Sequence, residues 1–302
     1  CRPHHFFIRT PFLRQNYKKI REMMSYKGVR GRAAHIFGVI MLVFLGLVFA
    51  MPLYWMISTA LKYETYCFTT PPQWFPNPIK WSNFTEIFGR MDMARYIKNT
   101  LITSILPVIG TLISCPMVAY SITKIPWKGG KYLFPIILMT MMIPSMVTQI
   151  PMYATWSKLG MLNTFIPLVL PSFFGSTYYI YLFRQFMKSL PTSVIEAARI
   201  DGAGDFRILY SIVYPMCSSI LTTVAVMVFI ACWNDYVGPL MYLQDSKLYT
   251  LGIGLQMFKN AAQPEWTLLM AASTVFTVPL IVIFFFCQNA FLNGIQTTSG
   301  IK

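Results

Sequence analysis

Few side chains in this sequence could take part in chemistry, and several of the polar ones lie inside apolar stretches. The chain of 302 residues has only ten Asp and Glu and three His. Polar groups are costly inside an apolar phase and are kept mostly where they face a cavity or one another. We therefore expect them either to line a path for a polar solute or to form interhelical hydrogen bonds. The candidates are Thr148, Gln149, Ser176, Tyr178, Tyr179, Trp233, Asn234 and Asp235.

The sequence does not indicate an enzyme. No Ser, His, Asp and Glu set converges on one segment, and no GxxxxGK[ST] phosphate loop occurs, so we do not expect this chain to hydrolyse ATP. The cysteines form no CxxC pair, and four of the six lie in apolar runs, where they act as small hydrophobic residues. Cys1 follows no apolar signal, so we expect a missing initiator region rather than a lipidated terminus. We predict no catalytic residue, metal site or cofactor here.

Composition indicates an all-α polytopic membrane protein. Hydrophobic residues make up 55% of the chain and charged residues 12%, whereas soluble domains carry about 25% charged residues. The 20 prolines fit this class, because membrane helices tolerate proline when neighbouring groups satisfy the freed carbonyls. A span needs about 20 apolar residues. Six predicted transmembrane helices form one domain at 33–292, with spans at 33–60, 96–122, 132–156, 164–186, 216–240 and 266–292.

The segments outside these spans are polar. Residues 1–32 form a basic head that we expect to lie against anionic lipid headgroups rather than nucleic acid. Two long excursions, 62–94 and 241–265, are expected on the side of the membrane opposite to this head. In the first, Ser82 and Asn83 followed by Glu86 predict a helix start. Residues 293–302 form a short tail.

Charge predicts the orientation. Most of the 25 Lys and Arg residues lie in the head, in residues 123–131, in residues 184–215 and at the C-terminus. Loops rich in Lys and Arg stay in the cytoplasm. We therefore expect both termini and the stretch 191–215 to be cytoplasmic. This bias explains much of the net charge of +15 without a polyanionic partner.

The stretch 191–215, PTSVIEAARIDGAGDFRILYSIVYP, is too elaborate for a simple turn between two spans. Thr192 and Ser193 can cap a helix whose first turn contains Glu196, where the helix dipole favours an acid. Ala197 and Ala198 favour a helix and let a partner approach closely.

The second half of this stretch predicts a sharp turn and another short helix. Asp201-Gly202-Ala203-Gly204-Asp205 allows the turn, because glycine adopts left-handed conformations at little cost. A helix over 206–214 would place Phe206, Leu209, Val213 and Tyr210 on one face. The helix–turn–helix would serve as a docking surface for another protein; the alternative is an interfacial amphipathic loop with no partner.

These residues resemble a known signature. Glu196, Ala197, Ala198, Gly202, Ile212 and Pro215 match EAA-x3-G-x9-I-x-LP, which is typical of membrane subunits of bacterial ATP-binding-cassette (ABC) importers. Tyr214 departs from the pattern, since leucine is usual there, and we expect its ring to fill the leucine pocket. The segment EAARIDGAG, with WNDY in the fifth span and LYTLGIGL after it, resembles the corresponding sequences of the carbohydrate (maltose-type) permeases, in particular of their shorter six-span subunit.

The resemblance implies an inner-membrane permease with several partners. It implies a second, similar permease, two ATPase subunits that carry ATP and Mg²⁺, and an extracytoplasmic sugar-binding protein. ATP binding would switch the cavity between inward- and outward-facing states. The residues implied in ATPase coupling are Glu196, Ala197, Ala198, Asp201, Gly202 and Gly204.

Two further regions carry over from the resemblance. They are the loop before the last span and the tail 293–302, which would reach into the ATPase interface or, as the alternative, be a disordered end. Asn260 and Gln263, before the last span, would contact the binding protein, although a plain connecting loop is the alternative. Sugars suit aromatic platforms with amide and carboxylate partners, so the candidates for the substrate path are Gln149, Tyr178, Tyr179, Trp233, Asn234 and Asp235. The resemblance leaves open that the partner permease holds most sugar contacts.

Other functions compete with this one. An ABC importer for peptides or polyamines would share the EAA residues but not necessarily the WNDY and LYTLGIGL wording. A secondary transporter would be expected to show intramembrane acids for ion coupling and often a repeated half, and neither is evident. The cargo stays open between a neutral malto-oligosaccharide and an acidic uronate oligosaccharide such as an alginate fragment, which the cations predicted to face outwards would tolerate.

Overall fold

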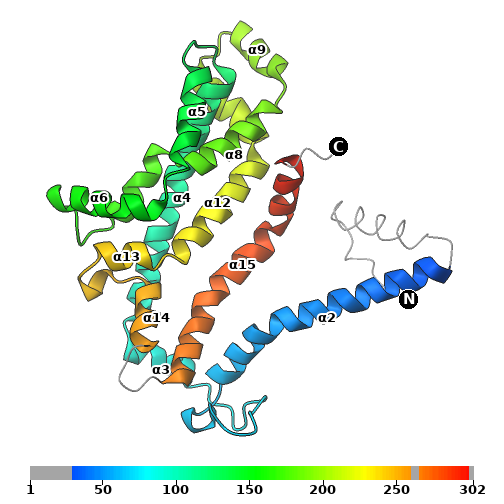
Figure 1. Cartoon of the computed structure of the whole chain (residues 1–302), viewed down its shortest axis with the longest axis vertical. Helices are drawn as coiled ribbons and strands as arrows, with labels where there is room; N and C mark the ends of the chain where they lie inside the picture. The colour runs from blue at the N-terminus through cyan, green and yellow to red at the C-terminus, as the bar shows by residue number, and fades with distance from the viewer. Residues whose placement is uncertain (1–28, 260–264, 299–302) are drawn as a thin grey trace, which may run out of the picture. The chain divides into compact units, whose positions relative to one another are not determined.

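The computed structural model describes residues 29–259 and 265–298, and side chains from residue 34 to 259 and from 265 to 288. Throughout these residues the regular structure is helical, without strands (Figure 1). The α-helices are α2 (Val29–Ala60), α3 (Asn83–Arg90), α4 (Met93–Lys124), α5 (Gly130–Thr140), α6 (Ser145–Lys158), α7 (Ile166–Val169), α8 (Thr177–Lys188), α9 (Thr192–Ile200), α10 (Asp205–Ile208), α11 (Tyr214–Met216), α12 (Ser218–Trp233), α13 (Val237–Tyr242), α14 (Leu251–Lys259) and α15 (Trp266–Thr298).

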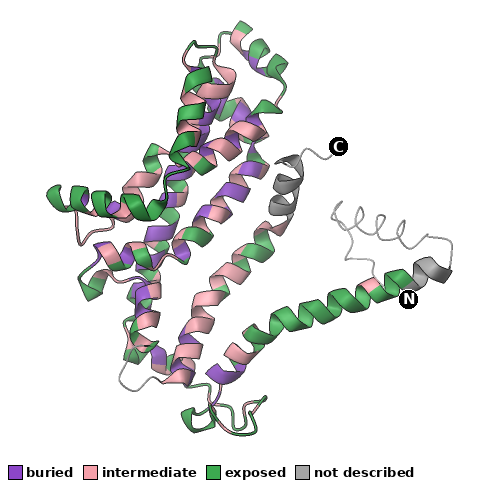
Figure 2. Ribbon diagram, viewed as in Figure 1, coloured by how far each residue is buried: buried purple, intermediate pink, exposed green. Residues whose placement is uncertain are grey.

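The chain divides into two compact units, Cys1–Ser58 and Thr59–Lys302. In the first unit, α2 exposes apolar side chains along almost its whole described length (Figure 2). Phe37, Leu42 and Phe49 are 67%, 70% and 79% exposed. Such a surface is unfavourable in water and suits the hydrocarbon of a bilayer.

Four described helical stretches are long and apolar enough to cross a membrane, and six if two bent pairs each count as one span. The first bent pair is α5 and α6, which meet at 95° across a short break. Pro144 lies at that break, just before α6, where a missing amide hydrogen costs little. The second pair joins residues 205–216 to α12 at 83°. The predicted third span is therefore bent, whereas the second bend lies at the start of the predicted fifth span, before α12.

The larger core of the second unit surrounds α4. Phe183 of α8, Val224 of α12 and Cys115 of α4 are fully buried in it. Close packing has a local cause at Gly110, where a methyl group would come within 2.6 Å of the Ser172 hydroxyl oxygen. Glycine therefore lets the stretch around Ser172 approach the α4 backbone.

A second core joins α3, α4, α12, α14 and α15 and contains Ile87, Trp233 and Leu251. Asn83, with no exposed surface, anchors it by donating two hydrogen bonds of 2.8 Å to the carbonyls of Ala60 and Lys62. The helix predicted at Asn83 is confirmed as α3.

Candidate functional site

The stretch 191–215 contains the predicted first helix, but the helix begins differently from the prediction. α9 starts at Thr192, and Pro191 precedes it in an extended conformation without a side-chain cap. Thr192 and Ser193 are therefore helical residues rather than caps, and Glu196 lies beyond the first turn. Proline takes the position before the helix because its restricted φ fits there.

The turn after α9 forms as glycine chemistry predicts. Gly202 has φ +80°, in the left-handed region. Its amide donates to the Arg199 carbonyl at 3.0 Å, and the Ala203 amide donates to the Ala198 carbonyl at 3.0 Å. This pair of bonds is a Schellman motif, which ends a helix at a left-handed residue. Gly204 has an ordinary φ of −71°.

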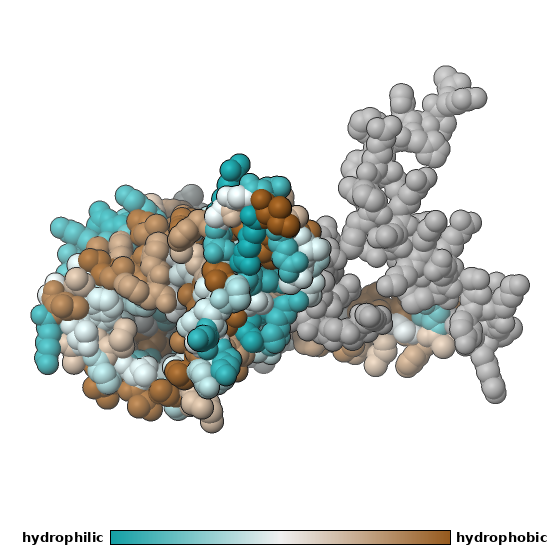
Figure 3. Space-filling model, turned by 90° about the horizontal axis from the view of Figure 1, so that it is seen from above, coloured by the Kyte–Doolittle hydropathy of each residue, from teal (hydrophilic) through white to brown (hydrophobic). Residues whose placement is uncertain are grey.

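α9 buries one apolar residue and one signature residue, and it exposes the other signature residues. Ile195 and Ala198 are buried, whereas Glu196, Ala197 and Ile200 are exposed, as are Asp201, Gly202 and Gly204. Ile200 is 86% exposed. The outer face of α9 therefore combines a carboxylate with apolar surface. Figure 3, which looks onto this end of the bundle, shows hydrophilic and hydrophobic side chains intermixed.

A polar cluster that the sequence did not predict ties α9 to α4 and α10. Arg199 donates to Asp205 Oδ1 at 3.0 Å and to the Lys124 carbonyl at 3.1 Å. The Tyr120 hydroxyl donates to the same Asp205 oxygen at 3.3 Å. The hydrogen bond to Asp205 raises the pKa of the Arg199 guanidinium above its ordinary value. The only sequence signal was an Arg and an Asp on either side of the glycine turn.

The second short helix differs from the prediction. A single helix over 206–214 is replaced by α10, a π-helical turn (Leu209–Val213) and α11. Leu209 and Val213 are buried, but Phe206 and Tyr210 are 68% and 43% exposed. The four residues therefore do not share one buried face, because the wider π turn changes the register of the side chains.

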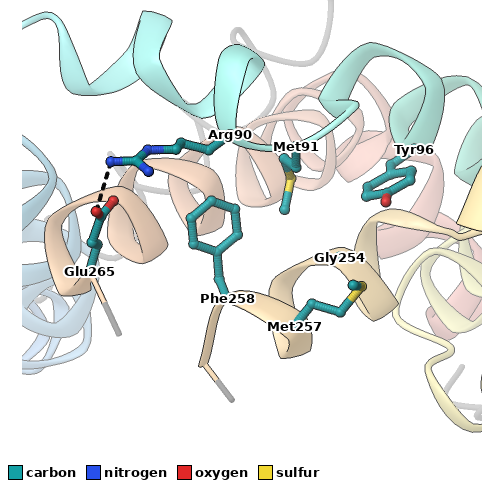
Figure 4. Close-up of a pocket in the computed structure, with 7 residues that line it drawn as sticks. All are labelled: Arg90, Met91, Tyr96, Gly254, Met257, Phe258 and Glu265. Carbon is teal, nitrogen blue, oxygen red and sulfur yellow. Dashed lines mark hydrogen bonds and ion pairs between the residues drawn. The ribbon is translucent and has the colours of Figure 1, made fainter. Parts of the chain in front are cut away.

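The opposite end of the same unit holds a pocket of about 300 Å³ (Figure 4). The ion pair between Arg90 and Glu265, 2.9 Å long, borders it. Tyr96 and Phe258 contribute aromatic rings. Gly254 is needed here, since a methyl group on it would lie 2.6 Å from the Tyr96 ring. The pocket also includes Met91 and Met257.

Glu64 fixes the start of α15 near this pocket. Its carboxylate accepts hydrogen bonds of 2.9 Å from the amides of Trp266 and Thr267 and from the Thr267 hydroxyl. A carboxylate at a helix N-terminus satisfies otherwise unpaired amides and interacts favourably with the helix dipole. The sequence did not predict this contact, because the partners are about 200 residues apart.

The predicted path residues do not form one cluster. Trp233 is 1% exposed, its ring stacks on Phe229 and its indole N–H donates to the Phe276 carbonyl at 3.1 Å. Packing in the core leaves it no open face, which does not suit a residue that lines a path for a solute. Asn234 follows the last residue of α12, and Asp235 accepts from the Gly238 amide at the start of α13.

The other path candidates lie on separate helices. Tyr178 and Tyr179 pack edge to face in the first turn of α8, and Gln149 is a half-buried residue of α6. Asn260 and Gln263 lie outside the described residues, between α14 and Glu265. No cluster of three metal-ligating side chains occurs in the part of the chain that the structure describes.

Long apolar helices, several with prolines inside them, together with a polar helical segment at one end and an aromatic pocket at the other, define a multi-pass helical membrane protein. Residues 108–296, well over half of the chain, match the family described as "Binding-protein-dependent transport system inner membrane component". The chain belongs to this family of inner membrane transport components.

Known relatives agree with this assignment. The chain is similar to the probable ABC transporter permease protein YurM of Bacillus subtilis, with 28% identity and 83% of each chain covered. It is similar to the melibiose/raffinose/stachyose import permease protein MelC of the same species, with 28% identity, 82% of this chain and 90% of MelC covered. It is also similar to the sn-glycerol-3-phosphate transport system permease protein UgpE of Brucella abortus, with 28% identity, 88% of this chain and 97% of UgpE covered.

One solved structure shares the fold. It is a chain of a bacterial ABC transporter involved in the import of the acidic polysaccharide alginate, with a TM-score of 0.76 at 23% identity. The match covers 86% of this chain and 98% of that chain. The fold of this chain is thus one that a chain of an ABC importer also has.

Proposed function

We propose that this chain is the membrane subunit of an ATP-driven importer that moves an oligosaccharide into the bacterial cytoplasm. The observation that carries the proposal is the exposed outer face of α9, where Glu196 and Ala197 of the signature lie beside the exposed Ile200. A carboxylate beside apolar surface suits a groove of another protein that contains a basic residue. The relatives named for oligosaccharide import support the sugar as cargo.

The energy source in this proposal is a pair of separate ATPase subunits, which carry ATP and Mg²⁺. They dock on α9 and on the matching segment of a second permease. The Arg199–Asp205–Tyr120 cluster then joins the docked helix to the last turns of α4, so that a displacement of α9 acts on α4. Both termini and α9 face the cytoplasm in this arrangement, as the distribution of Lys and Arg favours.

The pocket at the other end is the proposed contact region for the extracytoplasmic binding protein. Its lining includes Phe258 and Glu265, and the predicted contacts Asn260 and Gln263 fall between these two residues in the sequence. Arg90 and Glu265 supply charge at its border and Tyr96 supplies an aromatic face. The proposed path between the two ends uses Gln149, Tyr178, Tyr179, Asn234 and Asp235.

The test is ATPase stimulation in the reconstituted complex. The chain is tagged in its own bacterium, and the complex is placed in nanodiscs with the binding protein encoded beside it. We expect an oligosaccharide to raise the ATPase rate several-fold. Neutral malto-oligosaccharides, uronate oligosaccharides, sn-glycerol 3-phosphate, peptides and polyamines are compared. Stimulation only by a member of the last three would refute the sugar, and a complex without ATPase would refute the proposal as a whole.

A further inference from the structure

A proline inside α4 leaves one backbone carbonyl without its helical partner. Pro116 has no amide hydrogen, so it cannot donate to the carbonyl of Leu112 four residues earlier. Helix α4 nevertheless continues through Pro116 to Lys124. Inside a membrane such a carbonyl must find another donor, since no water is available to supply one.

Tyr214 supplies that donor. Its hydroxyl donates to the Leu112 carbonyl oxygen at 2.6 Å, across 102 residues of sequence. The tyrosine is half-buried and its ring packs against Tyr210 at 4.9 Å between centroids. The hydroxyl therefore takes over the role of the missing Pro116 amide. The leucine usual at this position of the signature could fill the space but could not donate.

Tyr214 also lies between an irregular helical turn and a bend in the chain. It begins α11, directly after the π-helical turn Leu209–Val213. Two residues later α11 ends, and the chain then bends by 83° into α12. The bond thus joins the end of the α9–α11 segment to α4, at the turn where Pro116 removes one backbone hydrogen bond. Together with the Arg199 and Tyr120 contacts, it gives the segment three polar attachments along α4.

We propose that Tyr214 is a positioning residue that passes movement of the α9–α11 segment to α4 at the carbonyl that Pro116 leaves without a helical donor. The part of this inference that concerns movement rests on the proposed function, because docked ATPases would move the segment. The hydrogen bond itself, and its dependence on Pro116, do not rest on it. The two parts are therefore tested separately.

The first test is a double-mutant cycle between Tyr214→Phe and Pro116→Ala. Reversible unfolding in mixed detergent–lipid micelles measures the stability of the chain. Hydrogen bonds within membrane proteins contribute an average of about 0.6 and at most about 1.7 kcal/mol, so Tyr214→Phe should lower the folding constant by about 3- to 20-fold. In the Pro116→Ala background the restored amide serves Leu112, and the effect should fall to less than twofold. Equal effects in both backgrounds would overturn the assignment of the bond.

The second test follows movement in the assembled complex. Hydrogen–deuterium exchange is compared with and without ATP and vanadate, in wild type, Tyr214→Phe and Tyr214→Leu. We expect wild type to change exchange in both 205–216 and 108–120, and both variants to change it only in 205–216. A variant that keeps the response in 108–120 would overturn the role in transmission. If wild type responds in neither segment, the proposed function fails, and the movement part with it, while the first test still decides the hydrogen bond.

Discussion

Removing the carboxylate of Asp205 is expected to loosen α9 from the bundle by a small, calculable amount. Asp205 accepts from Arg199 at 3.0 Å and from Tyr120 at 3.3 Å. The side chains of the ion pair are 34% and 45% exposed, so solvent screening limits the pair to less than about 1 kcal/mol. The tyrosine hydrogen bond adds about 1 kcal/mol. Asp205→Ala should therefore cost about 1–2 kcal/mol.

The assay is reversible unfolding in mixed micelles, with Asp205→Ala, Arg199→Ala and the double variant. Because Arg199 also donates to the Lys124 carbonyl, the two single variants should not cost the same. Their coupling energy isolates the ion pair and should be about 0.3–1 kcal/mol. Arg207→Ala is the control, since it removes a cation from exposed surface of the same segment and should change stability by less than about 0.5 kcal/mol. Additive single variants would refute the reasoning.

Three further changes test other parts of the structure. Asn83→Ala should cost about 2–3 kcal/mol in the same unfolding assay, because two buried carbonyls lose their amide donor; no loss would contradict the anchor. Gly110→Val should lower thermal stability more than Gly89→Val, since Gly110 is tightly packed and Gly89 has open space around it. The hydrogen bond from Lys80 lowers the pKa of Glu86, so this pair stabilises the folded state above the ordinary Glu pKa of about 4.3 and stops doing so as the pH falls through the lowered value. Lys80→Met should raise the pKa of Glu86, measured by carboxyl ¹³C NMR, and an unchanged pKa would exclude the pair.

The sequence predicted the features that depend on local patterns. Apolar runs gave the helical membrane fold, and the glycine at 202 gave the turn, because each follows from a few adjacent residues. The helix at Asn83 followed from its start signal in the same way. The signature residues gave the family to which the chain belongs.

Other features could not be read from the sequence, because they depend on contacts between distant segments. The bend between α5 and α6, the burial of Trp233 and the cap that Glu64 provides for α15 arise only when separate helices pack. Tyr214 is the clearest case. Its departure from the signature suggested a change in packing alone, whereas its hydroxyl serves a carbonyl freed by a proline about 100 residues earlier.

The central claim is that the α9 segment docks ATPase subunits, and co-purification measures it most directly. The tagged chain is isolated from its own membranes as wild type, Glu196→Ala, Gly202→Ala and Gly89→Ala, and bound ATPase is quantified against the chain. Alanine at Gly202, where φ is +80°, strains the turn by about 1–2 kcal/mol, whereas Gly89 lies in α3 with open space around it. We predict that wild type and Gly89→Ala retain two ATPase subunits for each pair of permease chains, and that Glu196→Ala and Gly202→Ala lose most of them. Equal ATPase in all four preparations, or none in wild type, would contradict the account.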